Sequence, residues 1–183
     1  IKGSVSTLVR AKIGPNNGEK LKSEAKIFFN KSISADKTKK IQFDFDKDNT
    51  IRVMKGLQVD YFSKKSQEDF FSKEYKVTRL TDRMGMRLEG FKLENNVDTN
   101  IKSEGLIKGV IQVPADGKPI IMLSDHGTIG GYPKIAVVIS ADYDKLVQLP
   151  PNTKIKFKLV DLKEAENLYE LYRLETENIL NRI

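Results

Sequence analysis

The polar side chains of this chain that could do chemistry gather in one glycine-rich stretch, residues 103–134. Six of the chain's twelve glycines lie in this stretch. Glycine lets the backbone turn tightly or come close to a ligand, and elsewhere it weakens strands. The polar residues among these glycines are Gln112, Asp116, Asp125, His126, Thr128, Tyr132 and Lys134. This composition predicts a shaped loop system rather than a plain sheet.

The segment 127–134 invites comparison with a phosphate-binding loop. It lacks the Gly-Lys-Ser/Thr ending and the strand–loop–helix context of a Walker A motif. The amides of Gly130 and Gly131 could still form an anion-binding nest, with Lys134 as a nearby cation. Spacing alone favours an ordinary loop over such a nest.

Two arginines, Arg83 and Arg87, lie four residues apart with Gly85 between them. If this stretch is extended, both guanidinium groups point to one face, because side chains alternate along a strand. Two guanidinium groups on one face suit a carboxylate or a phosphate. The alternative is that each arginine forms a surface salt bridge.

Asp116 and Gly117 stand between Pro114 and Pro119. Asp-Gly is among the commonest two-residue hairpin loops. Spacing alone therefore favours a turn at Asp116, and a role in binding or catalysis is the alternative.

Several kinds of site are excluded by composition. The chain has no cysteine, which rules out disulfides, thiolate metal sites and a cysteine nucleophile. His126 is the single histidine, so a site that needs two imidazoles is excluded. Nothing in the spacing pairs His126 with a nucleophilic hydroxyl, and we expect no Ser-His-Asp triad. No cluster of acidic residues and histidine has metal-ligand spacing either.

The net charge of +7 does not point to nucleic acid, because the lysines that cause it are scattered along the chain. A nucleic-acid binder usually gathers basic residues into a stripe, often with stacking aromatic residues. No apolar run approaches the ~20 residues of a membrane span. We therefore expect a solvated basic surface, with neither nucleic acid nor a membrane as partner.

The hydrophobic pattern predicts a mainly β domain with a few helices. Short runs separated by glycine, proline and aspartate favour antiparallel pairing in a barrel or a sandwich. Strands are expected at 24–29, 41–45, 51–54, 75–79, 84–93, 106–113, 118–124, 134–139 and 153–160. One or two short helices are expected over 57–71, with Ser66 as a possible N-cap, and another over 140–146. Asp161 and Glu164 resemble a capping box that starts a helix over 162–180.

Four segments occur in an order that is specific for one family. They are IRVMKGLQ at 51–58, TDRMGMRLEG at 81–90, SEGLIKGVIQVPADGKPI at 103–120 and GGYPKI at 130–135. On these residues the chain resembles the allophanate hydrolase subunit 2 family. That family includes the C subunit of 5-oxoprolinase, KipA-type antagonists of a kinase inhibitor and the carboxyltransferase module of urea carboxylase. The chain departs from the pattern at residues 125–128, where it has Asp-His-Gly-Thr and many relatives have Asp-Arg-Gln-Thr.

The resemblance implies a particular fold and domain division. Full-length members have two cyclophilin-like β-barrel halves. Residues 46–183 are thus expected to form a mainly β, cyclophilin-like C-terminal domain with short helices and a C-terminal helix. Residues 1–45 are similar to the end of the family's first half. The chain begins without methionine, and on this resemblance it is expected to be a fragment.

For function, the resemblance implies a cytoplasmic subunit of an ATP-dependent 5-oxoprolinase, which opens the lactam of 5-oxoproline to give glutamate. The implied partners are a subunit similar to allophanate hydrolase subunit 1, also called KipI-like, and a LamB/YcsF-like subunit. ATP is used by the assembled complex, and neither a metal nor covalently bound biotin is expected in this chain. Two alternatives are a KipA-type regulatory binding protein and a carboxyltransferase that acts on carboxybiotin and a urea-like amide.

The site residues follow from the chemistry that this reaction needs. Negative charge that develops on a lactam oxygen requires preorganised donors. Catalytic roles are expected for Gln112, Asp116 and Lys134, and substrate contacts for Arg83, Arg87, Asp125, Thr128, Gly130, Gly131 and Tyr132. We expect Arg83, Arg87, Gln112, Asp116 and Lys134 to line one pocket beside the loop 127–131.

Overall fold

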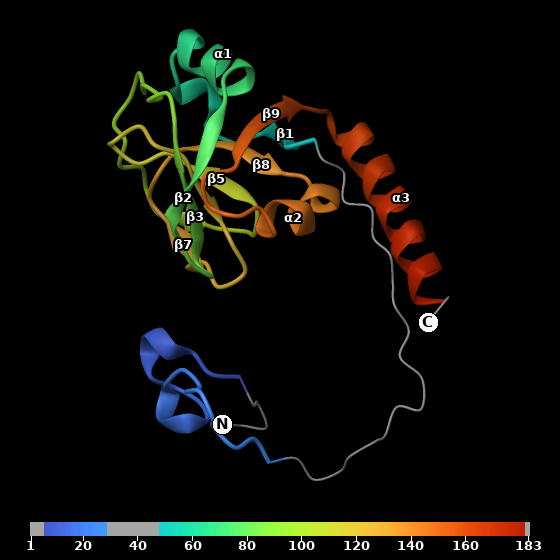
Figure 1. The fold of residues 1–183 in the computed structure, drawn as a ribbon. Coiled ribbons are helices and arrows are strands. Elements are labelled where there is room, and N and C mark those ends of the chain that lie inside the picture. The colour runs from blue at the N-terminus through green and yellow to red at the C-terminus, as the bar shows by residue number, and fades with distance from the viewer. Residues whose placement is uncertain (1–5, 29–47, 182–183) are drawn as a thin grey trace. The chain divides into compact units, whose positions relative to one another are not determined.

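The computed structural model describes residues 6–28 and 48–181. The chain divides into two compact units, Ile1–Lys40 and Ile41–Ile183, and each is described by itself (Figure 1). Among the described residues of the first unit there are two short 3-10 turns, η1 (Val9–Ala11) and η2 (Asn16–Gly18). Gly14, just before the second of these turns, and Gly18, at its end, both have positive φ.

Residues 6–28 contain little regular structure beyond these turns. The strand expected over 24–29 is wrong for residues 24–28, which form no strand. Instead, the Ala25 N–H donates to the Lys22 carbonyl in a turn. The strand expected at 41–45 lies outside the described residues.

The second unit is built on a closed seven-stranded barrel with the strand order β1-β8-β5-β6-β3-β2-β9 (Figure 1). Neighbouring strands are antiparallel, except that β1 and β9 run parallel and close the barrel. The strands are β1 (Thr50–Lys55), β2 (Tyr75–Thr81), β3 (Gly85–Glu89), β5 (Val110–Gln112), β6 (Ile120–Met122), β8 (Lys134–Val138) and β9 (Lys154–Leu159). The expectation of a mainly β barrel is confirmed.

Alternation along the strands fills the barrel interior. Ile51, Val53 and Val77 are completely buried. Helix α1 (Lys64–Ser72) adds Phe70, whose ring stacks on Phe157 with the two centroids 4.5 Å apart. A 3-10 turn, η3 (Val59–Tyr61), precedes this helix.

The start of α1 differs from expectation. Its N-cap is Ser63, whose side-chain oxygen accepts from the Ser66 N–H. Ser66 therefore supplies the donor of the capping bond and not the acceptor.

Two helices follow the last strands of the barrel. They are α2 (Ser140–Val147) and α3 (Leu162–Leu180), and the helix expected over 162–180 is confirmed. The Asp161 carboxylate caps α3 by accepting from the Glu164 N–H at 2.8 Å. Near its start, α3 buries Ala165 against a small cluster that contains Ile139 and Val160.

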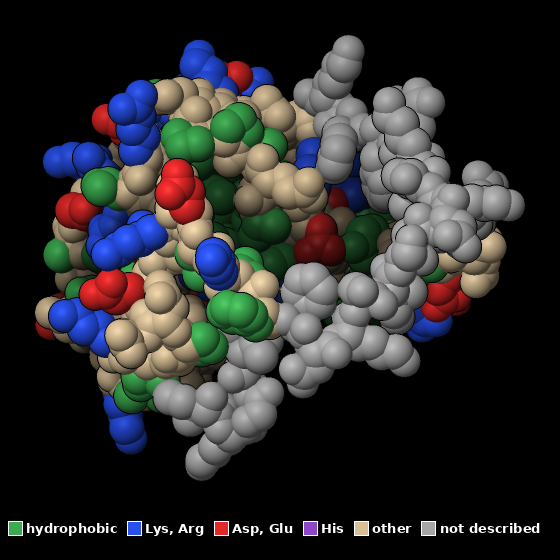
Figure 2. Space-filling view, turned by 60° about the horizontal axis from the view of Figure 1, so that its bottom comes forward, with side chains coloured by type: hydrophobic (Ala, Val, Ile, Leu, Met, Phe, Trp, Pro, Cys, Tyr) green, Lys and Arg blue, Asp and Glu red, His purple; other side chains and the backbone are tan. Residues whose placement is uncertain are grey.

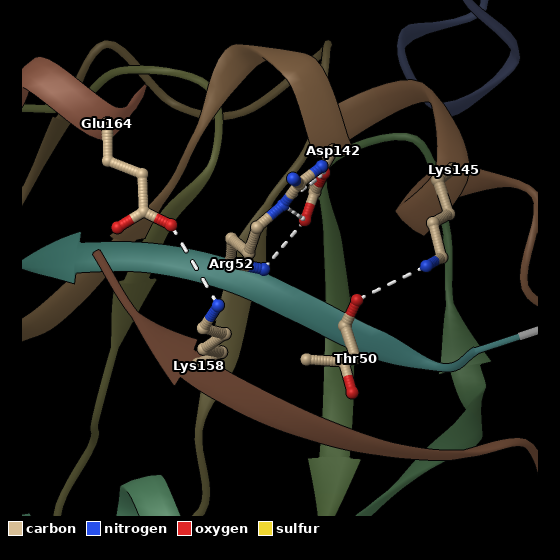
Figure 3. A network of polar contacts seen from close by, with 6 residues as sticks. All are labelled: Thr50, Arg52, Asp142, Lys145, Lys158 and Glu164. Atoms are coloured by element: carbon tan, nitrogen blue, oxygen red, sulfur yellow. Dashed lines mark hydrogen bonds and ion pairs between the residues drawn. The ribbon is translucent and has the colours of Figure 1, made fainter. Parts of the chain in front are cut away.

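A polar network ties the helices to the strands (Figure 3). The buried Asp142 carboxylate of α2 accepts from the Arg52 backbone N–H at 2.7 Å and from the Arg52 guanidinium. The Lys145 ammonium donates to the Thr50 carbonyl at 3.3 Å. One carboxylate therefore fixes both the backbone and the side chain of β1 against α2.

A second sheet of two short strands lies on the outside of the barrel. It pairs β4 (Glu104–Gly105) with β7 (Ile129–Gly130), and we call these two strands the flap. Next to it, Leu106 packs against the outward-facing Val110 and Met122. The flap therefore covers the outer face of β5, β6 and β8.

The charged surface has no single-sign stripe on the face that Figure 2 shows. Lysine and arginine side chains there alternate with acidic ones. Among residues 6–28 and 48–181, no helix is both long and apolar enough to cross a bilayer.

We expect amides of residues 6–28 to exchange hydrogen faster than those of residues 106–139. Among the residues of the first range whose burial is described, only Gly18 is buried, so few apolar contacts oppose local opening. Hydrogen exchange followed by mass spectrometry measures this directly. Equal protection of the two ranges would contradict it.

Replacing Asp142 with alanine should lower the free energy of unfolding by roughly 2–3 kcal/mol. Removing one partner of a fully buried ion pair costs about 3–5 kcal/mol, and the Arg52 side chain keeps 31% of its surface exposed. Urea unfolding followed by circular dichroism gives the difference. Glu68→Ala, which removes an exposed carboxylate of α1, is the control and should change stability by less than about 0.5 kcal/mol.

Candidate functional site

Four residues form a row across neighbouring strands on the outer face of the barrel. Arg87 is paired with Ile120, Ile120 with Gln112, and Gln112 with Lys134. Directly paired residues project from the same face of a sheet. The residues that alternate with them point into the core, among them Met86, Ile111 and Ile121. Because adjacent strands lie about 4.8 Å apart, the Cα atoms of Arg87 and Gln112 are separated by roughly 10 Å.

At one end of this row, the Lys134 ammonium is buried under the flap. Its side chain is 3% exposed, and its Nζ lies 2.8 Å from Glu104 Oε2. The Gln58 side-chain amide donates to the same oxygen at 3.0 Å. Two donors from the barrel side thus converge on one carboxylate oxygen of the flap.

Gln58 is held against Lys134 by the backbone as well. Its side-chain Oε1 accepts from the Lys134 N–H, and its own N–H donates to the Lys134 carbonyl, both at 3.2 Å. Gly56 permits this approach, because a Cβ at this position would lie 2.2 Å from the Lys134 carbonyl oxygen. The loop after β1 is therefore a fixed part of the site.

Gln112 lies beside Lys134 and is also buried. Its side-chain Nε2 donates to the Tyr132 carbonyl at 3.1 Å. A Cβ at Gly130 would come within 2.7 Å of that nitrogen and 2.8 Å of Leu106 Cδ1. Glycine at 130 thus lets the flap lie directly on Gln112.

The electrostatics of the site favour an ionised carboxylate. The hydrogen bond from Lys134, and after it the one from Gln58, hold the pKa of the Glu104 carboxyl below its usual value. The Glu104 side chain is 44% exposed, so solvent weakens this effect. The pair is thus a buried ammonium facing a carboxylate that is open to water on one side.

We call Gln58, Glu104, Gln112 and Lys134 the Lys134 cluster. Arg83 and Asp125 form a pair that is separate from it. The Arg83 guanidinium donates to both Asp125 carboxylate oxygens, at 2.6 and 2.9 Å. This contact lowers the pKa of Asp125 and raises that of Arg83. The expected common face for Arg83 and Arg87 is wrong, because the Asp82 carboxylate accepts the Met84 and Gly85 N–H groups in a turn before β3.

Arg87 and Asp116 meet in a third place, a shallow cleft of about 340 Å³ at the other end of the row. Asp116 belongs to the turn of the β5–β6 hairpin, in which Gly117 has a φ of +73°. Its carboxylate accepts from the Lys118 N–H at 3.0 Å. The turn alternative for Asp116 is confirmed, and its side chain also lines the Arg87 cleft.

The glycines of the loop 127–131 do not form a phosphate nest. Such a nest needs a left-handed residue, and the described glycines with positive φ are Gly14, Gly18, Gly109 and Gly117. The backbone of this loop serves the flap instead: the Thr128 carbonyl accepts from the Leu106 N–H, and the Gly131 carbonyl from the Ile101 N–H. Tyr132 is 39% exposed.

The five residues expected in one pocket are therefore divided among three places. Gln112 and Lys134 lie together under the flap, Arg87 and Asp116 line the cleft, and Arg83 pairs with Asp125. Two residues of the site, Gln58 and Glu104, were missed. Both lie inside the segments that carry the family resemblance, at 51–58 and 103–120, which is the signal that could have found them.

In the part of the chain that the structure describes, no side chains are assembled into a metal site or a catalytic triad. No group of three or more acidic or histidine side chains there is placed to hold a metal ion. His126 Nδ1 lies 2.6 Å from the Gly127 carbonyl oxygen, and the Ser124 hydroxyl lies 3.2 Å from the Tyr143 hydroxyl. Among the described residues, the Lys134 cluster is thus a buried site in which an ammonium and an amide converge on one carboxylate oxygen.

Sequence comparisons agree with the resemblance. A family model described as "Carboxyltransferase domain, subdomain A and B" matches residues 1–159. The protein named as the C subunit of 5-oxoprolinase in Escherichia coli is 35% identical over 169 residues, covering 90% of this chain and 53% of that protein. Its namesake in Haemophilus influenzae is 39% identical over 120 residues, covering 66% of this chain and 39% of its own length. The chain spans about half, or less, of these curated relatives.

Solved structures show the same fold. The crystal structure of the Kluyveromyces lactis urea amidolyase matches with a TM-score of 0.79 and 27% identity, over 97% of this chain and 12% of that one. The urea carboxylase structure from the same organism matches with the same TM-score and covers 18% of its chain.

The Glu104–Lys134 contact should make stability depend on pH. The folded pKa of Glu104 is lowered, so its stabilising effect is complete above the ordinary glutamate pKa of about 4.3 and is lost as pH falls through the folded value. The difference in unfolding free energy between the unchanged chain and Glu104→Gln should therefore be constant from about pH 5 to 7 and shrink below about pH 4.3. Urea titrations at several pH values measure it.

Lys134→Met is the control for this prediction. Without the ammonium, the Glu104→Gln substitution should lose most of its pH dependence, since the largest cause of the shift is gone. A pH profile that does not change in the Lys134→Met background would contradict the assignment.

Proposed function

The chain belongs to the carboxyltransferase domain family, subdomains A and B, and from this premise we propose that it works as part of the C subunit of an ATP-dependent 5-oxoprolinase. The observation that carries the proposal is its identity of 35% and 39% to two proteins of that name. The site supports it, because Lys134 and Gln112 place an ammonium and an amide beside each other in a water-poor position.

The proposed reaction adds water to a lactam. The C–N bond of the 5-oxoproline ring breaks, the carbonyl carbon gains an oxygen, and the nitrogen becomes the amine of glutamate. A lactam carbonyl is a poor electrophile, and negative charge grows on its oxygen as water adds to the carbon. We assign Lys134 Nζ to that oxygen, because a buried cation stabilises such charge more than one in water does. The Gln112 amide is the second proposed donor.

The substrate carboxylate is assigned to the Arg87 end of the row. Arg87 faces the same outer surface as Gln112, with Ile120 between them, and a guanidinium suits a carboxylate. Asp116 is proposed to contact the substrate in the same cleft. Gly130 of the flap and its neighbours Thr128, Gly131 and Tyr132 are proposed to cover the substrate. The Arg83 guanidinium and the Asp125 carboxylate already bind each other, so we propose that these two residues contribute less to substrate binding.

ATP does not fit the glycine loop of this chain, which lacks a phosphate nest. We therefore assign ATP to the partner subunits, one similar to allophanate hydrolase subunit 1 and one LamB/YcsF-like. We place the complex in the cytoplasm, where ATP is abundant.

Carboxyl transfer is the second candidate, and a specific observation favours it. The urea amidolyase structure matches 97% of this chain. A carboxyltransferase also develops negative charge on a carbonyl or carboxylate oxygen, for which the same two donors would serve. Testing the assembled complex with 5-oxoproline and with carboxybiotin separates the two reactions.

In a complex with its partner subunits, we expect phosphate release from ATP that depends on 5-oxoproline, and none from this chain alone. Lys134→Ala and Arg87→Ala should each lower turnover by about tenfold or more, which is about 1.4 kcal/mol or above. Arg83→Ala should have a smaller effect, since Arg83 is paired with Asp125.

Thermal unfolding of each variant checks that the fold is kept. Near-normal turnover in both Lys134→Ala and Arg87→Ala would refute the site assignment. Consumption of carboxybiotin without 5-oxoproline cleavage would favour the carboxyltransferase.

A further inference from the structure

The ammonium of Lys134 cannot meet a ligand while Glu104 is in place. Lys134 is 3% exposed, and its Nζ is in contact with the Glu104 carboxylate. The same Glu104 oxygen also accepts a hydrogen bond from the Gln58 side-chain amide. A ligand oxygen that is to use these two donors must therefore replace Glu104 Oε2.

The side chain that occupies this position has the same chemical structure as part of the proposed reaction product. Glu104 ends in two methylene groups and a carboxylate, which is also the γ-carboxyl arm of free glutamate. Opening of the lactam converts its carbonyl into that γ-carboxylate. We propose that Glu104 is a built-in mimic of the reaction product, and that its Oε2 marks where the product's γ-carboxylate is held by Lys134 and Gln58. This inference rests on the proposed function for the identity of the ligand.

The two sides of the contact differ in how firmly they are held. Gln58 makes two further hydrogen bonds to the Lys134 backbone, and Lys134 belongs to a barrel strand. Glu104, in contrast, belongs to a strand of two residues and is 44% exposed. A Cβ at the neighbouring Gly105 would meet nothing within 4 Å. The donors therefore stay fixed, and the half-exposed Glu104 side chain is the side that can move away.

Charge decides what can replace Glu104. Withdrawing it would leave a buried ammonium with no carboxylate partner, which is strongly unfavourable. Glu104 therefore leaves only in exchange for another anionic oxygen. When the product's carboxylate dissociates, Glu104 can return to the same two donors, which limits rebinding of the product. Glu104 is in this sense a specificity-determining residue for a small carboxylate.

The test measures binding of L-glutamate to the full chain by calorimetry, with L-glutamine as a probe that lacks the γ-carboxylate. Glu104→Ala should bind L-glutamate about tenfold or more tightly than the unchanged chain, since the internal competitor is gone. L-Glutamine should show no such gain. The double variant Glu104→Ala, Lys134→Ala should lose it. Glu177→Ala, which removes another half-exposed, ion-paired carboxylate, is the matched control and should bind as the unchanged chain does.

Circular dichroism shows whether Glu104→Ala folds. If it does not, Glu104→Gln takes its place, because the neutral amide keeps an acceptor for Lys134 but competes less well, and a smaller gain is expected. An equal affinity of the unchanged chain and the folded variant would overturn the proposal. So would L-glutamine binding as tightly as L-glutamate, or a gain that survives without Lys134.

The outcome is independent of the enzymatic assay. Tighter L-glutamate binding by the Glu104→Ala chain, with no cleavage of 5-oxoproline by the assembled complex, would uphold the carboxylate position and refute the proposed reaction. Cleavage of 5-oxoproline without a gain in binding would uphold the reaction and refute the mimic.

Discussion

A buried ammonium needs a carboxylate partner, and this requirement organises the outer face of the barrel. Lys134 begins the barrel strand β8, and its charge is covered. An unpaired charge in such a place would destabilise the fold. The chain supplies the partner from a separate small sheet. Glycine at 56 and at 130 lets a loop and the flap come close enough to close over the cluster. The flap is therefore held down by a charge as well as by the apolar packing of Leu106.

Local patterns predicted much of the fold, because the interactions behind them are close in sequence. The Asp161–Glu164 capping bond joins residues three apart, and the helix that it starts follows the expected range. The strands of the barrel follow from alternation. The flap strands are two residues long and carry no periodicity, so no pattern could reveal them.

The site was predicted only in part, because the residues that meet in it are far apart in the sequence. Gln112 and Lys134 stood out as polar residues among glycines. Glu104, the partner of Lys134 and Gln58, is 30 residues from Lys134 and 46 from Gln58. The contact therefore depends on strand pairing that sequence spacing does not show. Arg83 was grouped with Arg87 by spacing, but a turn at Asp82 sends it elsewhere.

The way in which the barrel closes has a consequence for the newly made protein. Strand β1 pairs within the barrel with β8 and β9, which lie at the far end of the domain sequence. At a synthesis rate of about 5–20 residues per second, the ribosome needs on the order of ten seconds to travel from Lys55 to β8. Throughout that time an apolar strand with Ile51 and Val53 has unpaired edges, which are templates for aggregation. Closure of the barrel must wait until β8 and β9 have left the ribosome, so faster synthesis shortens the time for which the edges of β1 stay exposed.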